Sequence, residues 1–233
     1  MDARRQAGND AITASWGADN INAGDGNNVV NAGGGNNTII TGSGNDTITA
    51  EWGNDVINSG AGNDLISAGW GADTINAGAG DDTITTGGGN DTVRAGLGND
   101  TIIADQWSND TYFFAAGDGQ DSLLDAGGQD QLVLENISSS QLWFTHTGND
   151  LNINVIGTTD SITLKDWYSG SQYPGSQYHA EQIQTSDGKV LLDSQVQNLV
   201  DAMAAFAPPT AGQTTLAADY ANTLAPVIAA SWQ

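Results

Sequence analysis

The chain has 233 residues, with 28 acidic side chains against 5 basic ones and a formal net charge of −23. A charge of this size repels nucleic-acid phosphates and anionic lipid headgroups, so the composition disfavours both as partners and favours cations. Because the chain contains no cysteine, disulfide bonds and thiolate metal sites are excluded, and oxygen atoms remain as the metal ligands to consider.

The N-terminal segment MDARRQAGNDAITASWG contains no apolar stretch of the kind found in a signal peptide. Elsewhere, too, the sequence contains no apolar run long enough for a membrane span. We therefore expect that export of this protein, if it occurs, uses a route without an N-terminal leader.

Glycine recurs along the first half of the chain with a period of nine residues. A second glycine often stands two places before the first, which doubles the turn-forming signal in each unit. A fixed period of this kind predicts a stack of similar structural units. The periodic glycines are Gly8, Gly17, Gly26, Gly35, Gly44, Gly53, Gly62, Gly71, Gly80, Gly89 and Gly98, and the second set is Gly24, Gly33, Gly42, Gly60, Gly69, Gly78, Gly87 and Gly96.

Two further positions keep the same period. Four places after each periodic glycine stands Ile or Val, from Ile12 to Ile102. Each unit is therefore predicted to be a glycine-rich turn followed by a three-residue strand whose middle residue points inward. Two places after each periodic glycine stands an acid or its amide: Asp10, Asp19, Asn28, Asn37, Asp46, Asp55, Asp64, Asp73, Asp82, Asp91 and Asp100.

The energetics of such a stack require a further stabilising term. One buried Ile per unit contributes about 1.5–3 kcal/mol, whereas ordering nine residues of backbone costs on the order of 9–18 kcal/mol. With two units per coil, equivalent aspartates would lie about 4.8 Å apart and repel one another. A hard dication held by aspartate oxygens and by carbonyls of the glycine turns would reverse that repulsion.

The units resemble the nonapeptide G-G-x-G-x-D-x-U-x of the RTX (repeats-in-toxin, haemolysin-type) calcium-binding family over about residues 6–110. The resemblance implies an all-β fold, a parallel β-roll with two nonapeptides per coil, and several Ca²⁺ ions between stacked turns. The implied ligands are the acids and amides named above together with Asp110, and backbone carbonyls of the turn glycines. They also include carbonyls of the small residues that replace the first glycine of the pattern: Ser59, Ala68, Ala77, Thr86 and Ala95.

Several units depart from the family pattern. Asn28 and Asn37 carry neutral side chains, so we expect the sites that they share with neighbouring turns to be weaker. Gln6, Ser15 and Glu51 replace the second glycine, which predicts a partly occupied first coil and an uncertain turn around Glu51. The register shifts by one residue before Asp110, and two divergent echoes follow at Asp121 and Asp130.

These observations predict three regions: a calcium-binding β-roll at 1–110, a β-rich cap at 111–193 and a helical segment at 194–233. The cap resembles the haemolysin-type calcium-binding related region. The acid-poor, apolar C-terminus resembles the uncleaved signal of type I secretion substrates, which implies a bacterial, secreted protein that meets the type I secretion machinery. In the alternative, the two helices merely pack on the cap.

The sequence offers little support for an enzyme. His146 and His179 lie outside any H-E-x-x-H motif and are expected to be solvated residues of the cap. The repeated carboxylates lie in nearly identical sequence surroundings. An acid–base pair needs two different environments, so the pattern favours calcium binding over acid–base catalysis.

Two functions follow from this pattern. The first is a non-catalytic module that folds on binding extracellular calcium and supports type I secretion of a larger exported protein. The second is an adhesive or carbohydrate-binding module that uses a row of tryptophans along one side of the roll. A turn position that tolerates aromatic side chains is the simpler explanation of that row. The tryptophans are Trp16, Trp52, Trp70 and Trp107.

Overall fold

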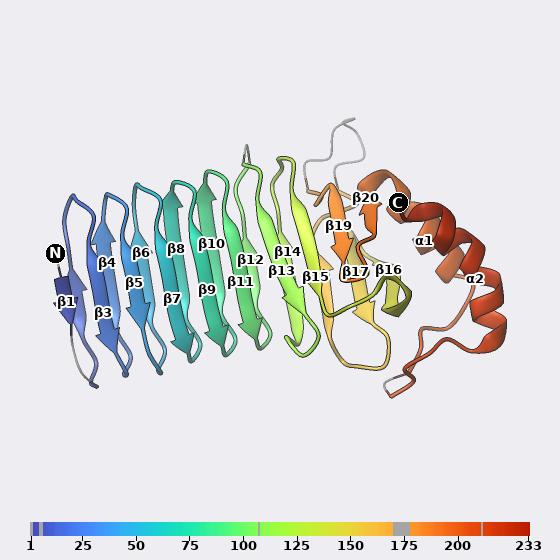
Figure 1. Cartoon of the computed structure of the whole chain (residues 1–233), viewed down its shortest axis with the longest axis horizontal. Helices are drawn as coiled ribbons and strands as arrows, with labels where there is room; N and C mark the ends of the chain where they lie inside the picture. The colour runs from blue at the N-terminus through green and yellow to red at the C-terminus, as the bar shows by residue number, and fades with distance from the viewer. Residues whose placement is uncertain (1, 5–6, 107, 170–177, 211) are drawn as a thin grey trace.

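The computed structural model describes residues 2–4, 7–106, 108–169, 178–210 and 212–233. Figure 1 shows an elongated stack of strands with two helices beyond its C-terminal end. Gln6 and Trp107, both discussed above, lie outside the described residues.

Two ten-stranded sheets form the long walls of the stack, and successive strands of the roll alternate between them. The first sheet contains, in spatial order, β1 (Asp2–Arg4), β3 (Asn20–Gly24), β5 (Thr38–Thr41), β7 (Val56–Ala61), β9 (Thr74–Ala79), β11 (Thr92–Leu97), β13 (Thr111–Ala115), β15 (Gln131–Glu135), β19 (Gln182–Thr185) and β20 (Val190–Leu192). The second contains β16 (Leu142–Thr147), β17 (Asp150–Val155), β18 (Ser161–Leu164), β14 (Gln120–Leu124), β12 (Thr101–Ile103), β10 (Thr83–Gly88), β8 (Leu65–Trp70), β6 (Thr47–Ala50), β4 (Val29–Gly33) and β2 (Ala11–Thr13).

Strand register confirms the predicted coil of two nonapeptides. Within the repeats each strand pairs in parallel with the strand two positions later, so that Ile84 lies opposite Ile66, 18 residues earlier. In the same way Ile57 lies opposite Ile75. The predicted parallel β-roll is therefore the observed fold.

The interior of the roll holds more than the predicted row of aliphatic residues. That row is buried as expected, with Ile66 and Ile75 at most 1% exposed. The expectation of a single buried side chain per unit is wrong, because Ala68 and Ala77 are also buried. Most repeat strands run beyond three residues, and the residue two places after the Ile therefore points inward as well. The small residues at the first position of the pattern thus belong to the core.

The stack tolerates the irregular turn at Glu51. The pairing of β4 with β6 shifts in register between Asn31 and Gly33, and the shift places Gly33 opposite Ala50, directly before Glu51. The backbone of Glu51 still donates to the carbonyl of Gly33 and accepts from the N–H of Trp70. The coil therefore continues through this turn without the usual glycine.

Both sheets extend past Asp110 with larger inward side chains. Tyr112 and Phe114 on β13 and Leu132 on β15 fill the interior there. Strands β18 and β19, which come much later in the chain, join the two sheets in parallel, and antiparallel neighbours then close each sheet.

The C-terminal residues pack against the end of the stack. Helix α1 (Asp193–Met203) contacts β16 and β20, and α2 (Ala218–Ser231) packs on α1. Gln233 exchanges two backbone hydrogen bonds with Val190. A short 3₁₀ helix, η1 (Ser139–Gln141), precedes β16. No helix within the described ranges is both long and apolar enough to cross a lipid bilayer.

Candidate calcium-binding turns

The repeat aspartates form a ladder along each edge of the roll. The Oδ1 atom of Asp73 accepts a hydrogen bond of 2.7 Å from the backbone N–H of Asp55, 18 residues earlier. Asp91 does the same for Asp73, at 2.8 Å. On the other edge, Asp82 accepts from the N–H of Asp64 at 2.7 Å. One oxygen of each of these carboxylates is therefore used in stacking the coils.

The side chain of the residue before each aspartate accepts a hydrogen bond from the following coil, whereas the aspartates accept from the preceding coil. The Oδ1 atom of Asn45 accepts from the N–H of Asn63, at 3.0 Å, and Asn63 accepts from the N–H of Asp81, at 3.1 Å. Each turn is thus held by a side chain from the coil before it and by one from the coil after it.

Backbone carbonyls of each turn point at the glycines of the next coil. A Cβ atom built on Gly78 would overlap the carbonyl oxygen of Gly60, and one on Gly80 would overlap that of Gly62. Both positions also have positive φ, +111° and +130°, which side chains rarely adopt. Only glycine fits here, and the carbonyl oxygens therefore gather between successive turns.

The second oxygen of these aspartates is buried and lacks a partner. An unpaired buried carboxylate oxygen is costly, so a row of them indicates a missing ligand. Among the described residues, the buried Oδ2 atoms of seven successive repeat aspartates accept no hydrogen bond: Asp46, Asp55, Asp64, Asp73, Asp82, Asp91 and Asp100.

The turn of Asn28 indicates which kind of ligand the aspartate turns lack. Its Oδ1 atom accepts from the N–H of Asp10 at 3.0 Å, as the aspartates do for their neighbours, so its Nδ2 takes the place of their Oδ2. That Nδ2 donates to the carbonyls of Gly24 and Gly26, at 3.0 and 2.8 Å. An ionised aspartate at this position has no N–H group, so its turn presents the Oδ2 atom and two carbonyl oxygens, a donor set that calcium fits.

The Asn turns therefore differ from the Asp turns for a physical reason. In the turns of Asn28 and Asn37 a neutral amide N–H group donates to the carbonyls at the place where a cation would bind in the aspartate turns. Asp10 and Asp19, in the first coil, donate their N–H groups to these two amides. The expected weak metal binding at this end thus has a structural basis, and it stays a prediction.

Two of the carbonyls at the first position of the pattern, those of Ser59 and Ala77, accept hydrogen bonds from side chains inside the roll. The hydroxyl of Thr41 donates to the carbonyl of Ser59, and the hydroxyl of Ser59 donates to that of Ala77. Within the described ranges no three His, Cys, Asp or Glu side chains group together so as to hold a metal. A metal held in the turns would therefore need backbone carbonyls beside the aspartates.

Burial disfavours the charged form of the repeat aspartates. Desolvation is the main cause that raises the pKa of Asp73 and of Asp82 to about 7, and that of Asp91 to about 8. Neighbouring carboxylates, such as Asp55 beside Asp73, raise the pKa further. In the folded, metal-free state the carboxyl groups of Asp73, Asp82 and Asp91 are therefore partly protonated near neutral pH.

The aspartate ladder ends on a residue that sequence reasoning missed. Asp110 donates its N–H to Asp130 at 2.7 Å, and Asp130 donates its own to the Oε2 atom of Glu181 at 2.6 Å. Glu181 thus takes the place of a repeat aspartate although it lies 51 residues beyond Asp130. No periodic signal connects the two positions.

Replacing Asp73 by Asn tests this account of the turn. We expect Asp73→Asn to bind less calcium than the parent and to keep its turn, because the new amide can donate to the carbonyls of Gly69 and Gly71. Asp73→Ala supplies neither a ligand nor a donor, so with calcium bound in the other turns it should be less stable than Asp73→Asn by about 1–3 kcal/mol. Thermal unfolding and bound calcium should be measured for both; equal stabilities would contradict the account.

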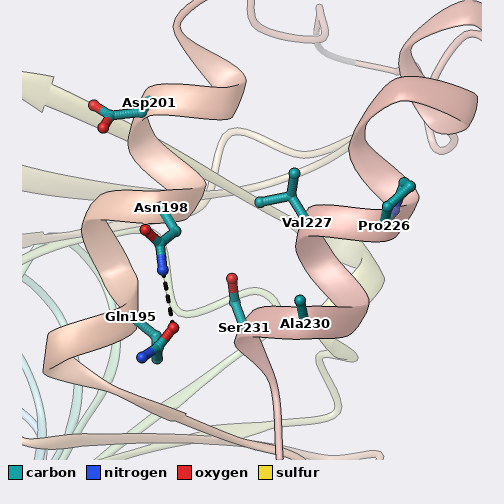
Figure 2. Close-up of a pocket in the computed structure, with 7 residues that line it drawn as sticks. All are labelled: Gln195, Asn198, Asp201, Pro226, Val227, Ala230 and Ser231. Carbon is teal, nitrogen blue, oxygen red and sulfur yellow. Dashed lines mark hydrogen bonds between the residues drawn. The ribbon is translucent and has the colours of Figure 1, made fainter.

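A shallow pocket of about 450 Å³ lies between α1 and α2 (Figure 2). Asp201 is the ionisable residue in its lining, and Asn198 donates to Gln195 at 2.9 Å. Asp201 on α1 and Ser231 on α2 both line the pocket, and Figure 2 shows no hydrogen bond between them. Of the two histidines, His146 is exposed, whereas His179 is stacked on Trp167 rather than solvated. The lining residues are Gln195, Asn198, Asp201, Pro226, Val227, Ala230 and Ser231.

The parallel strands of the two sheets and the oxygen-lined turns define a calcium-binding β-roll. Comparison with protein families agrees: residues 6–30, 31–66 and 67–102 match the RTX calcium-binding nonapeptide repeat. Residues 150–195 match the haemolysin-type calcium binding protein related domain. The chain is therefore an RTX protein.

The similar proteins include two haemolysins of Escherichia coli. The chromosomal haemolysin is 30% identical over 100 residues, and the plasmid haemolysin is 27% identical over 103 residues; these stretches cover 40% and 41% of this chain. The chain matches only about 10% of the length of each. The extracellular lipase LipA of Serratia marcescens is 16% identical over 58% of this chain and 37% of its own, with a TM-score of 0.24. A score this low does not establish a common fold for the two chains.

Proposed function

We propose that this chain is a calcium-dependent folding module that orders when it binds extracellular calcium and supports type I secretion of the protein to which it belongs. The observation that carries the proposal is the row of buried Oδ2 atoms without partners, from Asp46 to Asp100. Calcium between successive turns would join these oxygens to the glycine carbonyls. In this role the module carries out no reaction.

Calcium binding then supplies folding free energy. Without the ion, folding would bury a row of mutually repelling carboxylates in a chain whose net charge is −23. A ligand that binds only the folded state stabilises it in proportion to its concentration. The module would therefore stay unfolded at the low calcium concentration of a cytosol, pass through a secretion channel, and fold outside the cell.

The C-terminal residues 194–233 are proposed to be the export signal. An export assay in a bacterium with a compatible type I secretion system tests this part. Deletion of residues 194–233 should abolish export. The double variant Leu199→Ala, Met203→Ala is the control: it weakens the packing of α1 through two buried side chains and leaves the rest of the segment intact. Export of the deleted chain at the level of the parent would contradict the proposal.

The exposed tryptophans do not favour the carbohydrate-binding alternative. The rings of Trp52 and Trp70 are stacked on each other, 5.6 Å apart and 12° from parallel. A Cβ atom on Gly88 would lie 2.9 Å from the ring of Trp70, so that ring also covers the next coil. Sugars bind aromatic faces, and here the facing surfaces of Trp52 and Trp70 are already covered. The row is better explained as stabilising the turns.

A further inference from the structure

A second kind of carboxylate site lies inside the C-terminal end of the roll. Asp125 follows β14, in the stretch 103–149 that neither family match covers. Counted back from Asp130, it occupies the pattern position at which the repeats have Ala68 and Ala77. Its side chain is therefore directed inward, and the residue is only 3% exposed. A charged side chain at a core position of the roll needs a partner.

Neither Asp125 nor Asp130 has such a partner for its second oxygen. The Oδ1 atom of Asp125 accepts from the N–H of Gly127, at 3.0 Å, and that of Asp130 accepts from the N–H of Asp110, at 2.7 Å. Both Oδ2 atoms are buried and accept no hydrogen bond from the described residues. The two carboxyl groups are near enough to share a hydrogen bond if one of them is protonated.

No basic group among the described residues is found to act on Asp125. The other charged groups that act on Asp125 are Asp110 and Glu181, both acidic. Two hydroxyl donors are close by, but Ser108 and Tyr112 both donate to Asp110, at 3.0 and 3.1 Å. Asp110 is thus satisfied by the protein, whereas Asp125 and Asp130 are left as two buried carboxylates side by side.

The carbonyl oxygen of Ser108 and the Oδ2 atom of Asp130 both lie next to Gly128. A Cβ atom built on Gly128 would overlap the carbonyl oxygen of Ser108 and would lie 2.8 Å from the Oδ2 atom of Asp130. The glycine therefore keeps this space free of a side chain. Two carboxylates and a carbonyl form an all-oxygen donor set.

We propose that Asp125 and Asp130 hold a calcium ion inside the end of the roll, with the carbonyl of Ser108 as a further ligand. The site differs from those in the repeats because a second carboxylate reaches it from the core. Calcium suits it better than magnesium, which keeps several waters and needs octahedral geometry that so buried a place does not offer. The inference rests on the proposed calcium-dependent roll.

Calcium counting on the full chain tests the site. Asp125→Asn should bind one calcium ion fewer than the parent and stay folded, because its amide can donate to Asp130 as Asn28 donates to its carbonyls. Asp125→Ala, which introduces the residue of the repeats, should lower the affinity for one ion at least tenfold. Asp118→Asn is the control: this half-buried acid accepts from the N–H of Ala115, at 2.7 Å, and should leave the count unchanged.

Equilibrium dialysis with elemental analysis gives the number of ions, and circular dichroism reports the fold. If both Asp125 variants bind as many ions as the parent with the same affinities, the pair shares a proton and the inference is wrong, while the calcium-dependent roll stands. If both variants lose all calcium and their strand signal, the inference is also overturned, because Asp125 then serves the whole fold. A parent that binds no calcium would overturn the proposed function itself.

Discussion

Lowering the pH from about 8 to about 5 should restore β-structure to this protein in the presence of a chelator. The buried repeat aspartates cause this effect, since burial raises the pKa of Asp73 to about 7 and that of Asp91 to about 8 in the metal-free turns. In the unfolded chain the same groups titrate near their ordinary value of 3.8. Between these values the folded state binds more protons than the unfolded state.

The sign of the pH dependence follows from that difference. The contribution of these groups to stability is fully present below about pH 3.8 and is lost as the pH rises through about 7 to 8. Protons would thus partly replace calcium by removing the buried charges. We expect most of the strand signal seen with calcium to return near pH 5, measured by circular dichroism.

The calcium-loaded protein is the control for this experiment. Calcium binds the carboxylate form, so with the ion in excess the strand signal should change little between about pH 8 and 6. Its apparent affinity should fall as the pH is lowered, because protons compete for the same oxygens. A chelated sample that stays unfolded down to pH 5 would contradict the account of the buried aspartates.

Replacing Gly53 by Ala should destabilise the calcium-loaded roll far more than replacing Gly17. The two glycines occupy equivalent turns on one edge, and their φ angles are nearly the same, +132° and +135°. A Cβ atom on Gly53 would lie 2.5 Å from the carbonyl oxygen of Gly35, whereas one on Gly17 would meet nothing within 4 Å. Both variants carry backbone strain, but only Gly53→Ala should push the coils apart and displace the carbonyl of Gly35, a proposed calcium ligand.

The added cost of Gly53→Ala should be about 1–3 kcal/mol, the usual range for overpacking, in thermal unfolding with calcium. Gly117→Ala is a second control away from the N-terminal end, since Gly117 has a φ of +101° and open space around it. If all three variants lose the same stability, strain in φ alone explains the glycines, and the close stacking of the turns does not.

The strictly periodic part of this fold could be predicted from the sequence. A nine-residue period in three coupled positions fixes the coil, and the register of Ile66 with Ile84 follows once two units make one coil. The second core position, at Ala68 and Ala77, was not predicted from the sequence because small residues carry a weak hydrophobic signal. A two-residue alternation with the preceding Ile was present and would have located it.

The end of the roll could not be predicted in the same way. Glu181 completes the aspartate ladder from 51 residues away, and β18 and β19 join the sheets from distant parts of the chain. Such contacts depend on how the cap folds back, for which local patterns carry no information. The burial of Asp125 was not predicted either. An acid at an inward position can be assigned a role only once its neighbours in space are known.

The central claim is that calcium, joined to unpartnered aspartate oxygens and glycine carbonyls, folds the roll. Circular dichroism of the full chain near neutral pH, first in chelator and then during a calcium titration, tests it most directly. The account predicts that strand signal is largely absent in chelator and appears cooperatively with calcium, but not with magnesium at the same concentration. Full strand signal in the chelated sample, unchanged by added calcium, would contradict it.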